Sequence, residues 1–103
     1  MKRLLICLLL TTTLGCGKLQ QDQKEFNTGL KHSQREKWNE AIASYDRTIE
    51  IAPTHALAYV NRGHAYMNLG QLDQAIADSG KAIELNPKSP QAYVNRSACY
   101  IEQ

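Results

Sequence analysis

Apolar and small side chains recur three or four residues apart along most of the chain, which is the spacing of a helix face. Between residues 56 and 89 this spacing forms two stripes. They are Leu57, Val60, His64 and Met67, and then Leu72, Ala75, Ile76, Ser79, Ala82 and Ile83. Gly70 separates the two stripes and Pro87 follows the second, as expected at helix ends. No segment alternates with the period of two that a half-buried strand shows, so the pattern predicts helices only.

The pattern repeats with a fixed period of 34 residues. The pentapeptide at residues 58–62 recurs unchanged at residues 92–96, and Gly29 and Asn27 lie 34 residues before Gly63 and Asn61. A period of this length is typical of stacked helical hairpins. It divides the chain into unit one (22–55), unit two (56–89) and the first helix of a partial third unit (90–103).

These residues resemble the tetratricopeptide repeat, a 34-residue module of two helices. The matching positions in unit two are Tyr59, Gly63, Tyr66, Ala75, Ala82 and Pro87, and those in unit one are Gly29, Ala41, Tyr45 and Pro53. The chain departs from the family pattern where Arg62 and Arg96 replace a usual leucine. The resemblance implies an all-α fold: a short α-solenoid of two tetratricopeptide hairpins plus one terminal helix.

The first seventeen residues have the pattern of an export signal. Lys2 and Arg3 precede an apolar run from Leu4 to Leu14, which is shorter than the ~20 residues that a membrane-spanning helix needs. Gly15 and Cys16 then resemble the lipobox of bacterial lipoproteins, which implies cleavage before Cys16 and a lipid on its sulfur. We expect residues 18–21 to form a linker and the protein to be a membrane-anchored lipoprotein of the bacterial cell envelope. The alternative is an ordinary cleaved export signal.

Composition and motifs argue against several classes of function. The formal net charge of +2 comes from Lys2 and Arg3, and the rest of the chain is neutral, unlike a nucleic-acid-binding protein. The histidines and cysteines lack the spacing of a metal site, and neither a phosphate-binding loop nor a nucleophile elbow is present. We therefore expect no enzyme activity, no cofactor and no metal. Cys99, which lies 34 residues after Ala65, is expected to be a small buried apolar residue.

An asparagine recurs at the same place in each unit, as Asn27, Asn61 and Asn95. Stacking brings such equivalent residues to one side of an array, and an amide can both donate to and accept from a peptide backbone. The resemblance implies that this side is a concave peptide-binding groove. Its apolar floor would contain Phe26, Leu30, Leu57, Val60, His64 and Met67, together with Val94 and Ala98. The alternative is that these asparagines cap nearby backbone or only face solvent.

The family's best-known groove holds a C-terminal carboxylate with lysines of the first and third units. Phe26, Leu30 and Gln91 occupy places of that clamp here, so a clamp for a chaperone tail is not expected. We expect an adaptor or scaffold that binds a protein or peptide segment. Two alternatives remain open: a structural subunit that forms homo-oligomers through the helix carrying Tyr93, Cys99, Tyr100 and Ile101, or a fragment of a longer array.

Overall fold

The computed structural model describes residues 20–102, and in that range the chain forms five helices and no strand. The helices are residues 20–34, α2 (Trp38–Ile51), α3 (Ala56–Asn68), α4 (Leu72–Leu85) and α5 (Pro90–Glu102). The prediction of an all-α fold is therefore confirmed. Residues 20 and 21 are already helical, although the sequence analysis assigned them to a linker. The expected export signal, including Cys16, lies outside the described residues.

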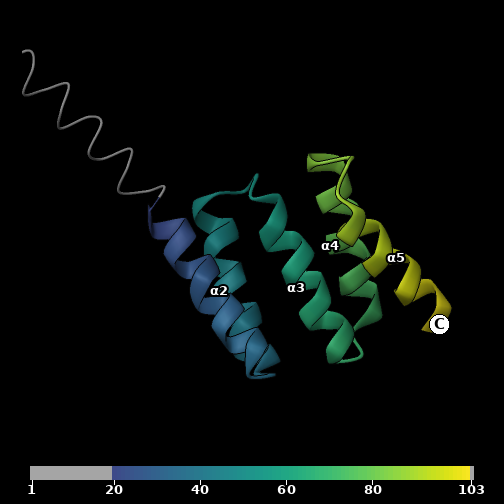
Figure 1. The fold of residues 1–103 in the computed structure, drawn as a ribbon, viewed down its shortest axis with the longest axis horizontal. Coiled ribbons are helices and arrows are strands. Elements are labelled where there is room, and N and C mark those ends of the chain that lie inside the picture. Colours follow the sequence, from purple (N-terminus) through teal and green to yellow (C-terminus); the bar gives the residue numbers. More distant parts are fainter. Residues whose placement is uncertain (1–19, 103) are drawn as a thin grey trace, which may run out of the picture.

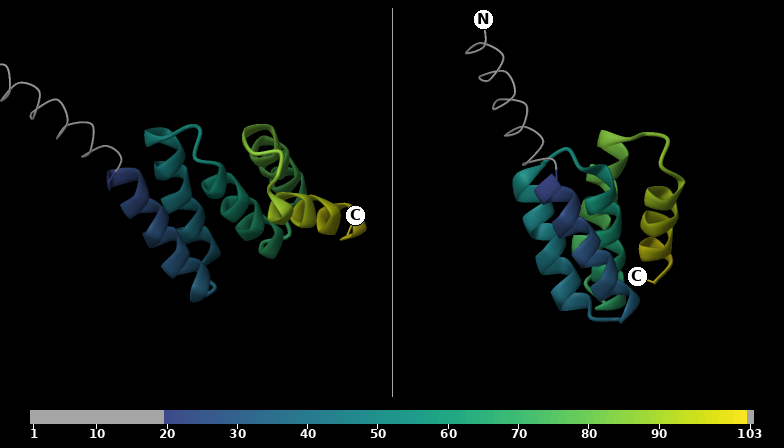
Figure 2. Two further views of the ribbon diagram at one scale, coloured as in Figure 1. Left: turned by 45° about the horizontal axis from the view of Figure 1, so that its top comes forward. Right: turned by 60° about the vertical axis from the view of Figure 1, so that its left-hand side comes forward.

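Successive helices stack side by side as hairpins (Figure 1). The helix of residues 20–34 precedes α2, and α3 and α4 form the second pair. Helix α5 packs against both α4 and α3 at one end of the stack (Figure 2). Within residues 20–102 no further helix follows α5 to cover its other side.

Both hairpin turns have the same backbone geometry with different residues. After α3, Gly70 has a φ of 75°, its N–H donates to Met67 O, and the N–H of Gln71 donates to Tyr66 O. This pair of hydrogen bonds is the Schellman motif, which satisfies the last carbonyl groups of a helix. In unit one, Glu36 occupies the equivalent place with a φ of 59°, and the N–H of Lys37 donates to His32 O. The first hairpin therefore makes a turn that favours glycine without having one.

Helices α3 and α5 each begin after a residue whose side chain caps the first turn. Ser89 precedes α5 and its Oγ accepts a hydrogen bond from the N–H of Ala92, while Pro90 is the first helical residue. His55 occupies the equivalent place before α3, and its Nδ1 accepts from the N–H of Ala58 at 3.2 Å. The predicted stop before Pro87 is also confirmed, because α4 ends at Leu85.

The core is built largely from alanines, with a few aromatic rings inserted between them. One cluster contains Phe26, Ala41, Tyr45 and Ala58, and the other contains Tyr59, Val60, Ala82 and Ala92. Tyr45 is fully buried and its hydroxyl lies 2.9 Å from Ser33 Oγ. Its ring fits because Gly29 has no Cβ; a Cβ there would overlap the ring. Unit one is therefore packed closely, although its match to the family pattern is the weaker of the two.

No helix in the described range is long and apolar enough to cross a bilayer.

Candidate functional site

The three recurring asparagines have three different environments. Asn27 is exposed and its Oδ1 accepts from Gln23 Nε2 at 3.0 Å. Asn61 is half-buried and its Nδ2 donates to Leu57 O, one turn earlier in α3. Asn95 is only 1% exposed, and its Nδ2 donates to Val60 O at 3.2 Å. The amide of Asn95 therefore connects α5 to α3, and only Asn27 and Asn61 remain accessible.

The residues predicted to form an apolar floor also divide into buried and exposed sets. Phe26 and Val60 belong to the two core clusters, and Leu30 packs against the first of them. Leu57 is 57% exposed, His64 is exposed, and Met67 is half-buried. The surface available to a ligand is therefore smaller than the sequence alone indicates.

A stripe of accessible residues runs along α3 through Leu57, Asn61, His64 and Asn68, of which Asn61 alone is half-buried; we call it the α3 stripe. The residues lie three or four positions apart, so they share one side of the helix. The His64 ring meets Trp38 of α2 edge to face, with 5.7 Å between the ring centroids. The α3 stripe contains no formally charged residue, and Arg62, the one charged residue of α3, makes its contacts on α2 and α4. The α3 stripe offers side-chain amides beside apolar surface, and this combination suits contact with a peptide backbone.

The described residues contain no closed pocket and no group of three or more potential metal ligands. Cys99 is fully buried, and burial raises the pKa of its thiol, with a further contribution from the charge of Glu102. A raised pKa leaves less thiolate, which is the reactive form. Cys99 thus packs as the small apolar residue that the sequence predicts.

A charge network that was not predicted from the sequence joins three helices, and it is buried on the Asp78 side and exposed on the Asp46 side. Arg62 of α3 makes two hydrogen bonds to Asp78 of α4, at 2.8 and 2.7 Å, and one to Asp46 of α2 at 2.9 Å. The side chains of Arg62 and Asp78 are 20% and 7% exposed. The hydrogen bonds to Asp78 raise the pKa of Arg62 above its ordinary value, so the guanidinium stays charged.

The Arg62 guanidinium also lies over two aromatic rings, 5.5 Å from the centroid of Tyr59 and 5.9 Å from that of Tyr66. A sequence signal for this network exists. Asp78 falls between Ala75 and Ala82 on the small-residue stripe of α4, where a lone carboxylate needs a partner.

The same row of tyrosine, arginine and tyrosine recurs on α5, but there no carboxylate within residues 20–102 pairs with the arginine. Arg96 lies 5.3 Å from the ring centroid of Tyr93, and Tyr100 occupies the place of Tyr66. Gly80 of α4 stands where Asp46 stands in α2. The equivalent of Asp78 would come from a helix following α5.

The model of one protein family, described as the tetratricopeptide repeat, matches residues 30–99. This match covers more than half of the chain. The chain belongs to the tetratricopeptide repeat family. The search of curated proteins gives no match.

Solved tetratricopeptide domains superpose on most of the chain. The TPR domain of Arabidopsis OM64 has a TM-score of 0.81 at 26% identity, with 82% of this chain and 70% of that domain covered. The TPR2B domain of yeast Sti1, in complex with pHsp70, has a TM-score of 0.79 at 30% identity, covering 81% and 66%. The first TPR of Spaghetti (RPAP3), bound to an HSP90 peptide, has a TM-score of 0.78 at 28% identity, covering 80% and 65%. This chain therefore spans about two thirds of the length of these tetratricopeptide domains.

Proposed function

We propose that this tetratricopeptide protein is a binding adaptor that holds an extended protein segment along the α3 stripe. The observation that carries the proposal is the stripe itself, in which an exposed leucine and two amides lie beside the His64–Trp38 ring pair without any formal charge. Two of the similar solved domains are in complex with pHsp70 or an HSP90 peptide, which supports peptide binding by this fold. The proposal assigns no catalytic step to the protein.

The expected ligand is an internal extended segment rather than a free C-terminus. A clamp for a terminal carboxylate needs cations, but Phe26 and Leu30 are buried or half-buried apolar residues at two of its places. At a third place, Gln91 donates through Nε2 to Asn95 Oδ1 at 3.0 Å. An uncharged surface of this kind selects by backbone hydrogen bonds and apolar contact, so binding should depend only weakly on salt.

A photo-crosslinking amino acid at position 57 tests the proposal. We expect it to capture a partner in mild detergent, because Leu57 is the apolar residue of the α3 stripe and is 57% exposed. The matched control is the same amino acid at position 81, because Lys81 is exposed on α4, away from the stripe. Capture at both positions alike, or at position 81 alone, would contradict docking on the α3 stripe.

Titration of the captured partner then tests the amide contact. Asn61→Ala should weaken binding about three- to tenfold, since one net hydrogen bond contributes roughly 0.5–1.5 kcal/mol. Equal affinities of the two proteins would show that Asn61 does not contact the partner.

We also propose that the protein is exported and anchored in the bacterial envelope by a lipid on Cys16. The basic start, the short apolar run and the Gly15-Cys16 pair support this proposal. Two or more acyl chains anchor a protein stably, whereas one chain holds it weakly. Cys16→Ser should release the protein into the soluble envelope fraction, and Cys7→Ser should leave it with the membrane. Intact-mass measurement of the wild type would contradict the proposal if Cys16 carried no lipid.

A further inference from the structure

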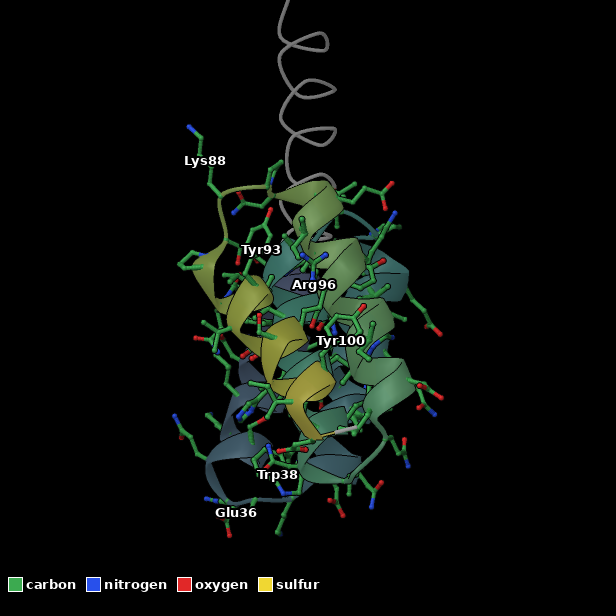
Figure 3. All side chains as sticks on the ribbon, turned by 90° about the vertical axis from the view of Figure 1, so that its right-hand side faces the viewer. Glu36, Trp38, Lys88, Tyr93, Arg96 and Tyr100 are labelled. Carbon is green, nitrogen blue, oxygen red and sulfur yellow. The ribbon has the colours of Figure 1, made fainter. Side chains whose placement is uncertain are left out.

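Helix α5 presents a row of side chains at the end of the stack, in which two exposed tyrosines flank a half-buried arginine. Tyr93, Arg96 and Tyr100 follow one another along it (Figure 3). They lie three and four residues apart, so they share one face, which we call the α5 end face. Tyr93 is 40% exposed and Tyr100 is 58% exposed, whereas Tyr59, the equivalent of Tyr93 in α3, is only 8% exposed.

The same row inside the stack shows what covers such a face. On α3, Tyr59 packs in one cluster with Ala82 of α4, and Arg62 donates to Asp78 of α4. The Arg62 guanidinium lies over the rings of Tyr59 and Tyr66. The covering side of α4 consists of small residues and one carboxylate, namely Ala75, Asp78, Ser79 and Ala82, all of them buried. Asp78 there receives both hydrogen bonds of the forked guanidinium. The internal interface is thus a template for an acidic, small-residue helix on a Tyr-Arg-Tyr row.

The α5 end face has the complementary charge, and within residues 20–102 no helix covers it. Arg96 forms no ion pair within the described part of the chain, and Gly80 replaces the carboxylate that the preceding helix would supply. A Cβ at Gly80 would have no atom within 4 Å, so space remains on that side. A guanidinium beside two exposed rings favours a planar anion such as a carboxylate.

We propose that the α5 end face binds an amphipathic helix of a partner protein, with one aspartate or glutamate set among alanines and serines as Asp78 is in α4. The carboxylate would accept a forked pair of hydrogen bonds from Arg96. A second copy of this chain is the poorer occupant. Its equivalent carboxylate, Asp78, already binds Arg62, and two α5 end faces brought together would place like charges opposite each other.

The geometry also sets how closely that helix approaches. Ser97 of α5 stands in the place of Gly63 of α3. A Cβ at position 63 would lie 3.3 Å from the Cβ of Asp78 and 3.4 Å from the carbonyl oxygen of Ala75. A helix docked on α5 would therefore lie a few tenths of an ångström farther from α5 than α4 lies from α3. The docking helix should still carry short side chains, such as alanine or serine, at this contact.

A peptide with the sequence of residues 71–88 is a direct probe, because it carries Asp78 in its own helical setting. Fluorescence anisotropy would measure its binding to the full chain in mild detergent. The matched control is the same peptide with Asp78→Asn. We expect the acidic peptide to bind about tenfold more tightly than the control, since close charge pairs at interfaces couple by at least that amount.

The Arg96→Leu protein decides whether Arg96 causes this preference. Leucine is a good helix former and is usual at this place in the family, so the fold should remain, as circular dichroism would verify. We expect the two peptides to bind this variant equally. If Arg96→Leu fails to fold, Arg96→Gln provides the same comparison.

Three results would overturn the proposal. One is a preference for the acidic peptide that persists in Arg96→Leu. Another is a set of amide shifts, in nuclear magnetic resonance spectra, that centres on α3 rather than α5, because the peptide would then be replacing the protein's own α4. The third is self-association of the protein without peptide that Tyr100→Glu abolishes, because the face would then belong to a second copy.

Discussion

Helices α3 and α5 contain the same five residues in a row, and the structure gives them different roles. In α3, Arg62 is held by two carboxylates and Asn61 faces outward with its amide bonded only within its own helix. In α5 the situation is reversed. Arg96 has no carboxylate within the described residues, and Asn95 is buried with its amide bonded to α3. A residue's type and helical position therefore define what it can do, and the neighbouring helices decide what it does.

The largest difference is expected between the two arginines. Arg62→Ala leaves the nearly buried carboxylate of Asp78 without its partner, which should cost about 3 kcal/mol of unfolding free energy. Arg96→Ala should change stability by less than about 0.5 kcal/mol, as surface substitutions usually do. Chemical denaturation of both variants measures the difference. Equal losses would mean that the α5 end face is already covered in the free protein.

Overpacking gives the next comparison. Gly63→Leu should cost about 2 kcal/mol, because even a Cβ there meets Asp78 and Ala75 of α4 closely. Ser97→Leu changes the equivalent residue of α5, which is exposed, and should be nearly neutral. Melting curves followed by circular dichroism compare the two. A stable Gly63→Leu protein would argue against the close contact of α3 with α4.

For the asparagines the costly substitution should be on α5, whereas for the arginines it should be on α3. Asn95→Ala removes a buried amide and its hydrogen bond across to Val60 O, so it should cost about 1–2 kcal/mol. Asn61→Ala should leave stability almost unchanged, because its amide is replaceable by water. Denaturation of both variants under the same conditions tests this. The assignment of Asn95 to the interior would be wrong if the two substitutions were equivalent.

The smallest effect is expected from giving Arg96 of α5 a carboxylate equivalent to Asp46, which pairs with Arg62 of α3. Gly80→Asp adds a carboxylate at the place that Asp46 has beside Arg62. It should stabilise the protein about 0.5 kcal/mol more when Arg96 is present than in the Arg96→Ala background, the usual size of an exposed ion pair. A double-mutant cycle isolates this term from the general benefit of removing a helical glycine. A coupling of zero would place the new carboxylate out of reach of Arg96.

The sequence alone is sufficient for most of the fold. The 34-residue period predicted the helices and their stacking, and Gly70 and Pro87 marked helix ends that the structure confirms. These signals are local, because a turn or cap depends on residues only a few positions apart. Glu36 shows the limit of such signals. It adopts the positive φ of a turn glycine, because the turn is closed by the hydrogen bonds from its own N–H to Ser33 O and from the N–H of Lys37 to His32 O.

The candidate site was less predictable, because exposure depends on which helix lies opposite. A repeat pattern assigns Asn27, Asn61 and Asn95 the same role, but only the contact of α5 with α3 shows that Asn95 is buried. The network of Arg62 joins residues 16 positions apart on either side, a separation without a local signature. The peptide-docking role of the α3 stripe remains a prediction.

The double attachment of Arg62 has a consequence for how the protein unfolds. Asp46 belongs to the first hairpin and Asp78 to the second, so one guanidinium joins two units of a linear array. In such arrays the strength of contacts between neighbouring units decides whether they unfold separately or together. Arg62 thus contributes to cooperativity as well as to stability: its ion pair with Asp46 adds to the packing of α2 on α3, and both favour opening of the two hairpins together.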